Sequence, residues 1–125
     1  MQPKSKPVKV STAHAQHGEA SRYTPLSCFV TDNSEVSKIT QIMHALADET
    51  RVKIVIFLAK QAEGICVCTI VDQFQLDQST ISHHLRSLRK VGIINGVRKG
   101  VCIYYHFCVD ALIPLTAFLE TLGKA

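Results

Sequence analysis

From Ser34 onward, apolar residues recur three and four positions apart, the spacing produced by one face of an α-helix. Ser34 and Asp77 are suited to cap helix N-termini, and Gly92 is suited to end a helix. We therefore expect four helices, which run approximately over Ser34–Leu46, Asp48–Ala59, Cys66–Phe74 and Asp77–Gly92. In the second helix, the main apolar face is expected to comprise Val52, Val55, Ile56 and Ala59, broadened by Ile54 and Leu58.

After Gly92 the apolar period changes to two, which is typical of β-strands. Ile93–Val97 and Val101–Phe107 are expected to form a hairpin whose turn is Arg98-Lys99-Gly100. A last helix, Val109–Leu122, carries apolar residues nearly all round. The resulting order, α-α-α-α-β-β-α, predicts a mainly α (α+β) fold.

The first 33 residues differ from the rest of the chain. They show no helical or strand periodicity, and prolines at positions 3, 7 and 25 interrupt them. We expect 1–33 to be a flexible N-terminal arm and 34–125 to be the folded domain. Within the arm, Pro25–Val30 is apolar enough to pack on another surface.

Composition narrows the class of protein. The chain has 125 residues, of which 46% are hydrophobic, and its formal net charge is +4. No apolar run approaches the ~18 residues of a membrane span, and the first ten residues contain no secretory h-region. The protein is therefore expected in the cytoplasm, away from the membrane, where thiols stay reduced. Under these conditions, five cysteines that include the pair Cys66-x-Cys68 favour metal or redox chemistry over structural disulfides.

A short third helix followed by a capped, basic fourth helix is typical of a helix-turn-helix that reads DNA. Between Asp77 and Asp110 there are five cations and no carboxylate, as a phosphate-binding surface requires. The hairpin tip is then a wing that contacts the DNA backbone or the minor groove. The candidate DNA-binding residues are Gln78, Ser79, Ser82, His83, Arg86 and Lys90 on the helix, and Arg98 and Lys99 on the wing.

Four motifs resemble the ArsR/SmtB family of metalloregulatory repressors. They are the segments 45–51 (ALADETR), 65–70 (ICVCTI) and 79–85 (STISHHL), and the pair Tyr104-Tyr105. The resemblance covers roughly Val36 to Phe118. It implies a winged helix-turn-helix homodimer, joined through its first and last helices, that represses transcription from operator DNA. It also implies release from the operator when a toxic metal or metalloid ion binds.

The resemblance implies a metal site formed by the Cys-x-Cys pair and a cysteine of the arm, which gives Cys66, Cys68 and Cys28. Other site types of the family do not match, because the last helix has no histidine and the recognition helix has no cysteine. Three thiolates suit As(III), Sb(III), Hg(II) or Pb(II), whereas Cd(II) or Zn(II) would need a fourth ligand such as His14 or His17. Cys28 is alternatively a small apolar residue beside Phe29.

Three further residues have less specific interpretations. Cys102 and Cys108 are expected to fill space, although a second site near the wing remains an alternative. His84 lies on the apolar stripe of its helix and is expected to be a hydrogen-bonded core histidine, with the alternative that it is a metal ligand or supports the ligands. A thiol switch without metal is the alternative function. We do not expect an enzyme, because the sequence shows no nucleophile-base arrangement, no phosphate loop and no Cys-x-x-Cys pair.

Overall fold

A computed structural model describes residues 22–30 and 32–124 of the chain. The chain divides into two units, Met1–Asn33 and Ser34–Ala125, and each is described by itself. In the first unit, the described residues include one turn of 3-10 helix, η2 (Leu26–Cys28). The candidate ligands His14 and His17 lie outside the described residues.

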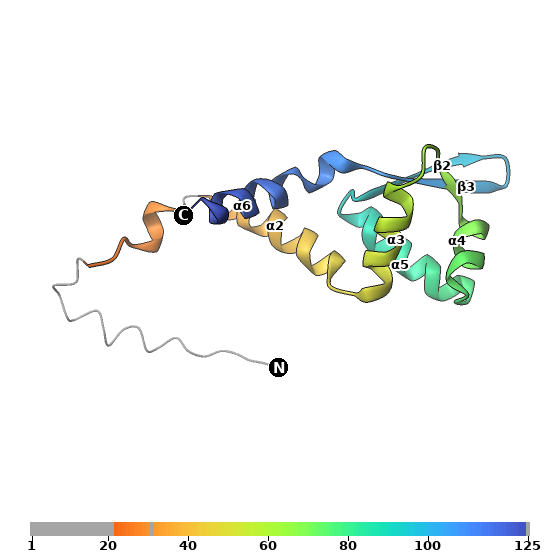
Figure 1. The fold of residues 1–125 in the computed structure, drawn as a ribbon, viewed down its shortest axis with the longest axis horizontal. Coiled ribbons are helices and arrows are strands. Elements are labelled where there is room, and N and C mark those ends of the chain that lie inside the picture. The colour runs from red at the N-terminus through yellow and green to blue at the C-terminus, as the bar shows by residue number, and fades with distance from the viewer. Residues whose placement is uncertain (1–21, 31, 125) are drawn as a thin grey trace. The chain divides into compact units, whose positions relative to one another are not determined.

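Two helices, α2 (Asn33–Leu46) and α3 (Glu49–Ala59), begin the folded part of the chain (Figure 1). The Asp48 side chain caps α3 by accepting a hydrogen bond from the backbone N–H of Arg51 at 3.1 Å. The predicted inner face of α3 is wrong, because Ile54 and Leu58 are buried while Val52 and Ile56 are exposed. The sequence of α3 is apolar on several sides, so spacing alone did not decide which side faces the core.

The helix-turn-helix consists of α4 (Val67–Phe74) and α5 (Gln78–Lys90). Gln75 ends α4 in the left-handed conformation (φ 55°), and the chain then turns into the cap of α5. The third helix was expected to begin at Cys66, but Ile65–Cys66 forms a short strand, β1, and Cys66 is the N-cap of α4. Two residues are too few to show an alternating pattern, so the sequence did not reveal β1.

The wing is the antiparallel hairpin of β2 (Ile94–Lys99) and β3 (Cys102–Phe107). Strand β1 pairs with the other edge of β3, which gives the sheet order β1-β3-β2. Arg98 and Lys99 belong to β2 rather than to the turn, which lies at Gly100-Val101. Gly100 has a φ of +67°, a conformation that suits glycine in a tight turn.

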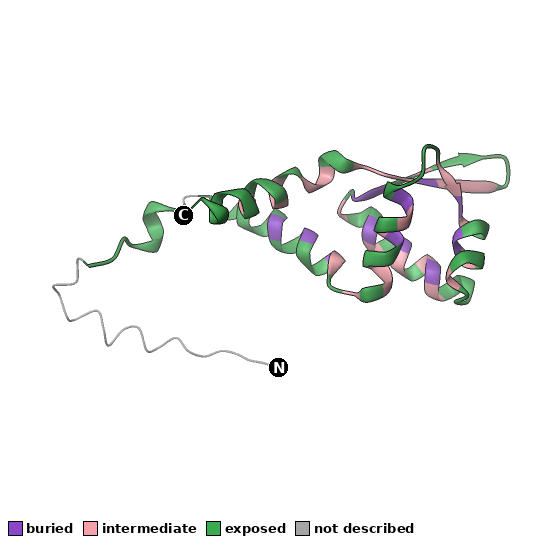
Figure 2. Cartoon of the chain, in the orientation of Figure 1, coloured by how far each residue is buried: buried purple, intermediate pink, exposed green. Residues whose placement is uncertain are grey.

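After the wing come a 3-10 turn, η3 (Val109–Leu112), and the last helix, α6 (Ile113–Gly123). The core lies between α2, α3, α4, α5 and the sheet, where Figure 2 shows the buried positions in purple. Its fully buried side chains are Ile54, Ile70, Ile81, Leu85, Leu88, Ile93 and Ile94. By contrast, α6 buries none of its residues. Among the described residues, no helix has the length and apolar character that crossing a bilayer requires.

Candidate metal site and nucleic-acid interface

Helix α5 is fixed at its start by a cap and along one side by the core. The carboxylate of Asp77 accepts a hydrogen bond from the backbone N–H of Thr80 at 2.9 Å, and its contacts with Thr80 lower the pKa of Asp77. Ile81, Leu85 and Leu88 are buried on the inner side of the helix. This burial leaves the opposite side of α5 free to meet a partner.

Most candidate DNA-binding residues of α5 lie on that opposite side, whereas Gln78, three residues before Ile81, lies at the start of the helix on the side of the buried stripe. The candidates are Gln78, Ser79, Ser82, His83, Arg86 and Lys90. All are exposed except Ser82, which is half-buried. On the wing, Arg98 and Lys99 are exposed, and Lys99 Nζ lies 5.6 Å from the centroid of the Tyr104 ring. These positions allow contact with a duplex, and their role in DNA binding remains a prediction.

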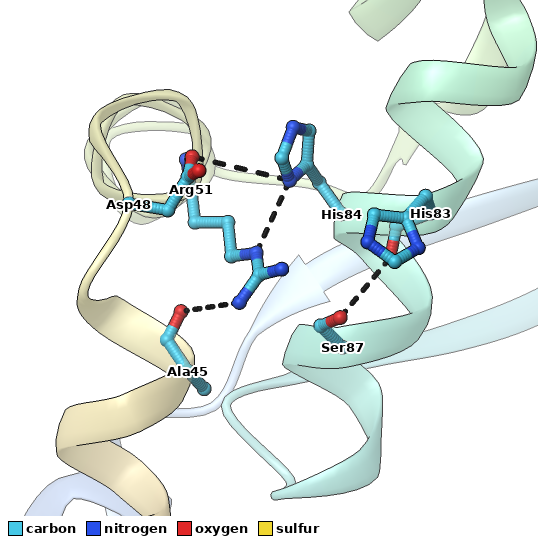
Figure 3. Close-up of polar contacts among 6 residues, drawn as sticks. All are labelled: Ala45, Asp48, Arg51, His83, His84 and Ser87. Atoms are coloured by element: carbon cyan, nitrogen blue, oxygen red, sulfur yellow. Dashed lines mark hydrogen bonds and ion pairs between the residues drawn. The ribbon is translucent and has the colours of Figure 1, made fainter. Parts of the chain in front are cut away.

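His84, on the inner side of α5, joins that helix to the start of α3 (Figure 3). Its Nδ1 accepts a hydrogen bond from Arg51 Nε at 3.1 Å, and Arg51 Nη1 also donates to the carbonyl oxygen of Ala45 at 3.4 Å. A nitrogen that accepts from Arg51 carries no proton. The 3.9 Å approach of Asp48 Oδ1 to the same nitrogen is therefore not an ion pair in that state. His84 is thus hydrogen-bonded as expected, but it is half-buried at the edge of the core and not part of it.

The two thiols of the Cys-x-Cys pair face each other at the start of α4. Cys66 Sγ and Cys68 Sγ are 2.8 Å apart. Cys66 is buried and Cys68 is exposed, so solvent reaches the pair from the Cys68 side. The hydrogen bond between the two thiols lowers the pKa of Cys66, and a hydrogen bond to the backbone of Cys68 lowers it further. The same thiol contact raises the pKa of Cys68.

A third thiol, that of Cys102 on β3, also reaches this pair. The side chains of Cys66 and Cys102 interact, and this interaction raises the pKa of Cys102 and contributes to lowering that of Cys66. Cys66 therefore has one thiol neighbour on its own segment and another on the wing. The expectation that Cys102 fills space left out the β1–β3 pairing, which brings its strand beside Cys66 and is not visible in the sequence.

The chain has two further cysteines, Cys108 and Cys28. Cys108 Sγ has the carbonyl oxygen of His106 as its neighbour, at 4.0 Å. Cys28 is exposed in η2, which belongs to the first unit of the chain. Over residues 22–30 and 32–124, no three His, Cys, Asp or Glu side chains are already placed around a common point that could hold a metal ion. In this part of the chain, Cys66 and Cys68 are thus a hydrogen-bonded pair beside Cys102 and do not form a closed cage with it.

Residues 48–96, which contain the helix-turn-helix, match the family model described as "Bacterial regulatory protein, arsR family". An uncharacterised HTH-type transcriptional regulator of Methanocaldococcus jannaschii is 34% identical over 85 residues, which cover 68% of this chain and 94% of that protein. The chain belongs to the ArsR family. The resemblance inferred from the four motifs is therefore confirmed.

Two further comparisons define the limits of the similarity. The arsenic resistance transcriptional regulator ArsR1 of Pseudomonas putida is 39% identical over 64 residues, or 51% of this chain. The match spans 49% of ArsR1, about half of its length. The solved structure of an ArsR-like transcriptional regulator from Rhodococcus sp. RHA1 has a TM-score of 0.64 at 24% identity and covers 73% of this chain and 84% of that one. This structure supports the winged helix-turn-helix fold.

Membership in the ArsR family settles the broad class of activity. The protein is a DNA-binding transcriptional regulator and not an enzyme, as the sequence predicted. The predicted fold class is also confirmed, with β1 as an addition to the expected order of elements.

Proposed function

We propose that this ArsR-family protein represses transcription as a homodimer on operator DNA and leaves the operator when a thiophilic ion binds Cys66 and Cys68. The observation that carries the proposal is the 2.8 Å approach of these two thiols at the start of α4. Helix α4 packs against α5, so a change at the thiols acts on the helix proposed to read DNA.

The donor set favours soft ions. Thiolates bind As(III), Sb(III), Hg(II), Pb(II) and Cd(II) in preference to hard cations. The lowered pKa of Cys66 supports this assignment, because the thiolate is the form that acts as a ligand. The similarity to ArsR1, whose name refers to arsenic resistance, favours As(III) among these ions. Cys28 of the arm is the third ligand expected from the family resemblance.

The proposed DNA interface has two parts. The outer side of α5 would enter the major groove, where Gln78 and Arg86 can make bidentate contacts to base edges. Arg98 and Lys99 on β2 would contact phosphates, which set the position of the protein but carry no sequence information. A twofold dimer would then read two half-sites about one helical turn apart.

Helices α2 and α6 support the dimer. Val36 and Met43 on α2 are exposed, as are Ile113, Leu119 and Leu122 on α6. Apolar side chains on two helices, exposed in a single chain, are typical of a surface that a second subunit covers.

Ion binding and DNA binding would be linked by a coupling free energy. An ion at the thiols would favour a dimer in which the two α5 helices no longer fit successive grooves. Because coupling is reciprocal, operator DNA would weaken ion binding by the same factor, typically about 5- to 150-fold, or roughly 1–3 kcal/mol.

A gel-shift titration tests the proposal. The reduced full-length protein would first select its binding site from random-sequence duplexes. The selected duplex would then be titrated with As(III), Sb(III), Hg(II), Pb(II), Cd(II) and Zn(II). We expect at least one thiophilic ion to release the DNA from the wild-type protein but not from Cys68→Ser, an exposed position where the substitution leaves no cavity.

The matched control is Cys108→Ser, which should respond like the wild type because its sulfur lies apart from the pair. Indifference of the wild-type protein to every ion would refute the metal-sensing part of the proposal. If a mild oxidant released the DNA where the ions did not, the same closely spaced thiols would act as the redox switch named above as the alternative.

A further inference from the structure

The pairing of β1 with β3 places the wing beside the Cys-x-Cys pair. Cys66 is opposite Tyr104 in this antiparallel register, and two residues further along the two segments lie Cys68 and Cys102. Alternate residues of a strand share a face, so Cys102 lies on the same face of β3 as Tyr104. The register therefore directs Cys102 toward the segment that carries both other thiols.

The side-chain contacts agree with the register. Cys66 Sγ is 2.8 Å from Cys68 Sγ, and the Cys66 side chain also interacts with that of Cys102. Cys102 is half-buried and Cys68 is exposed, so the group of three can be reached from solvent. All three belong to the second unit of the chain, and no part of the arm is needed to bring them together.

We propose that Cys102 is the third thiolate of the ion site, so that a trivalent As(III) or Sb(III) species is held by Cys66, Cys68 and Cys102. This inference rests on the proposed function and replaces Cys28 as the third ligand. The side chains must rotate from their hydrogen-bonded arrangement, since no three candidate ligands in the described part of the chain already surround a common point.

The reaction with arsenite is a balanced substitution. Arsenous acid, As(OH)3, exchanges its three hydroxyl groups for three cysteine sulfurs. Each thiol proton leaves with one hydroxyl group as water, so three As–S bonds form, three As–O bonds break, and no redox change occurs. Two thiols alone would leave one hydroxyl group on the arsenic, and the third sulfur removes it.

A ligand on β3 gives the ion a direct route to the wing. Cys102 pairs with Lys99 in the β2–β3 register, next to Arg98. An ion that draws Cys102 toward the start of α4 thus acts on the strand pair that carries the proposed phosphate contacts. The site would then link α4 to the wing within one protomer.

Mapping of protected thiols tests the inference in the wild-type protein, without relying on a variant that could misfold. The reduced full-length protein is alkylated with N-ethylmaleimide, with and without one equivalent of arsenite, and the labelled peptides are identified by mass spectrometry. We expect arsenite to slow labelling of Cys68 and Cys102, and to leave labelling of Cys28 and Cys108 unchanged.

Affinity provides the second measurement. As(III) binding can be followed by its sulfur charge-transfer absorption. Cys102→Ser should weaken it by at least about tenfold, because even changes around a ligand cost 10- to 100-fold. Cys108→Ser is the matched control and should bind like the wild type. Cys28→Ser distinguishes the two candidate third ligands, because it weakens As(III) binding only if Cys28 and not Cys102 completes the site.

The outcomes separate this inference from the proposed function. Protection of Cys28 together with Cys68, while Cys102 is labelled freely, would overturn the role of Cys102 and leave ion sensing intact. Protection of no thiol by arsenite would also overturn the inference. Failure of arsenite to protect any thiol would not by itself refute metal sensing. Metal sensing would be refuted if none of the other ions in the titration released the operator either.

Discussion

Helices α5 and α6 are similar in length but use their apolar residues in opposite ways. In α5 the apolar residues form one stripe, and Ile81, Leu85 and Leu88 on it are at most 1% exposed. In α6 most positions are apolar, yet no residue is buried, and Leu119 and Leu122 are 53% and 57% exposed. The apolar residues of α5 are buried by its own chain, whereas α6 packs Leu115 against the core but leaves other apolar side chains exposed, as is typical of a surface that a partner covers.

The largest expected effect comes from truncating one leucine on each helix. Leu85→Ala leaves a cavity in the core and should lower the free energy of unfolding by about 2–5 kcal/mol at any protein concentration. Leu119→Ala removes contacts that exist only between subunits under the proposed dimer, so its cost should shrink as the protein is diluted. Urea unfolding of both variants and the wild type, at several protein concentrations, measures the difference.

The dependence of the Leu119→Ala effect on protein concentration shows which surface α6 packs against. A concentration-independent loss of several kcal/mol for Leu119→Ala would mean that α6 is stabilised within a single chain. Sedimentation of the same samples would report whether any loss accompanies dissociation.

The second largest effect is expected from a substitution on the outer side of α5. This side is polar, whereas the exposed side of α6 is apolar. Arg86→Ala should weaken binding to the selected duplex by about 1–3 kcal/mol, because Arg86 is exposed on the side proposed to meet base edges. Its As(III) stoichiometry should not change. Lys60→Ala, an exposed cation at the end of α3, is the matched control, and equal losses in both variants would mean that net charge alone is responsible.

The same comparison shows how far the sequence predicts the fold. Helix α5 was predictable from local sequence. Asp77 marks its start, the apolar spacing marks its buried side, and Gly92 marks its end. Gly92 has a φ of +82°, a conformation that favours glycine. The buried side of α3 was not predictable, because Val52 and Ile56 are as apolar as Ile54 and Leu58, and only the position of neighbouring elements distinguishes them.

The candidate metal site shows the same limit. The Cys-x-Cys pair is visible in the sequence because a single residue, Val67, lies between its two cysteines. Cys102 lies more than thirty residues later, and its approach to Cys66 depends on the register between β1 and β3. Register is set by the packing of the whole sheet, so a two-residue strand gives no local signal of it.

The smallest expected effect tests the start of α5, where Asp77 provides a cap that α6 lacks. The side chain of Asp77 accepts from the Thr80 N–H, while α6 begins without a side-chain cap. Asp77→Ala should destabilise the protein by about 0.5–2 kcal/mol at neutral pH. Because folding lowers the pKa of Asp77 from its ordinary value of 3.8, the charged cap contributes fully above that pH.

Below pH 3.8 the contribution should fade as the pH drops through the lowered pKa of the folded state. The difference in unfolding free energy between the wild type and Asp77→Ala should therefore narrow on acidification, as followed by urea titration monitored by circular dichroism. Asp72→Ala, at an exposed position within α4, is the matched control and should show little difference from the wild type at neutral pH. A pH-independent gap for Asp77→Ala would mean that the carboxylate charge does not stabilise the start of α5, and that the residue acts there only through its shape.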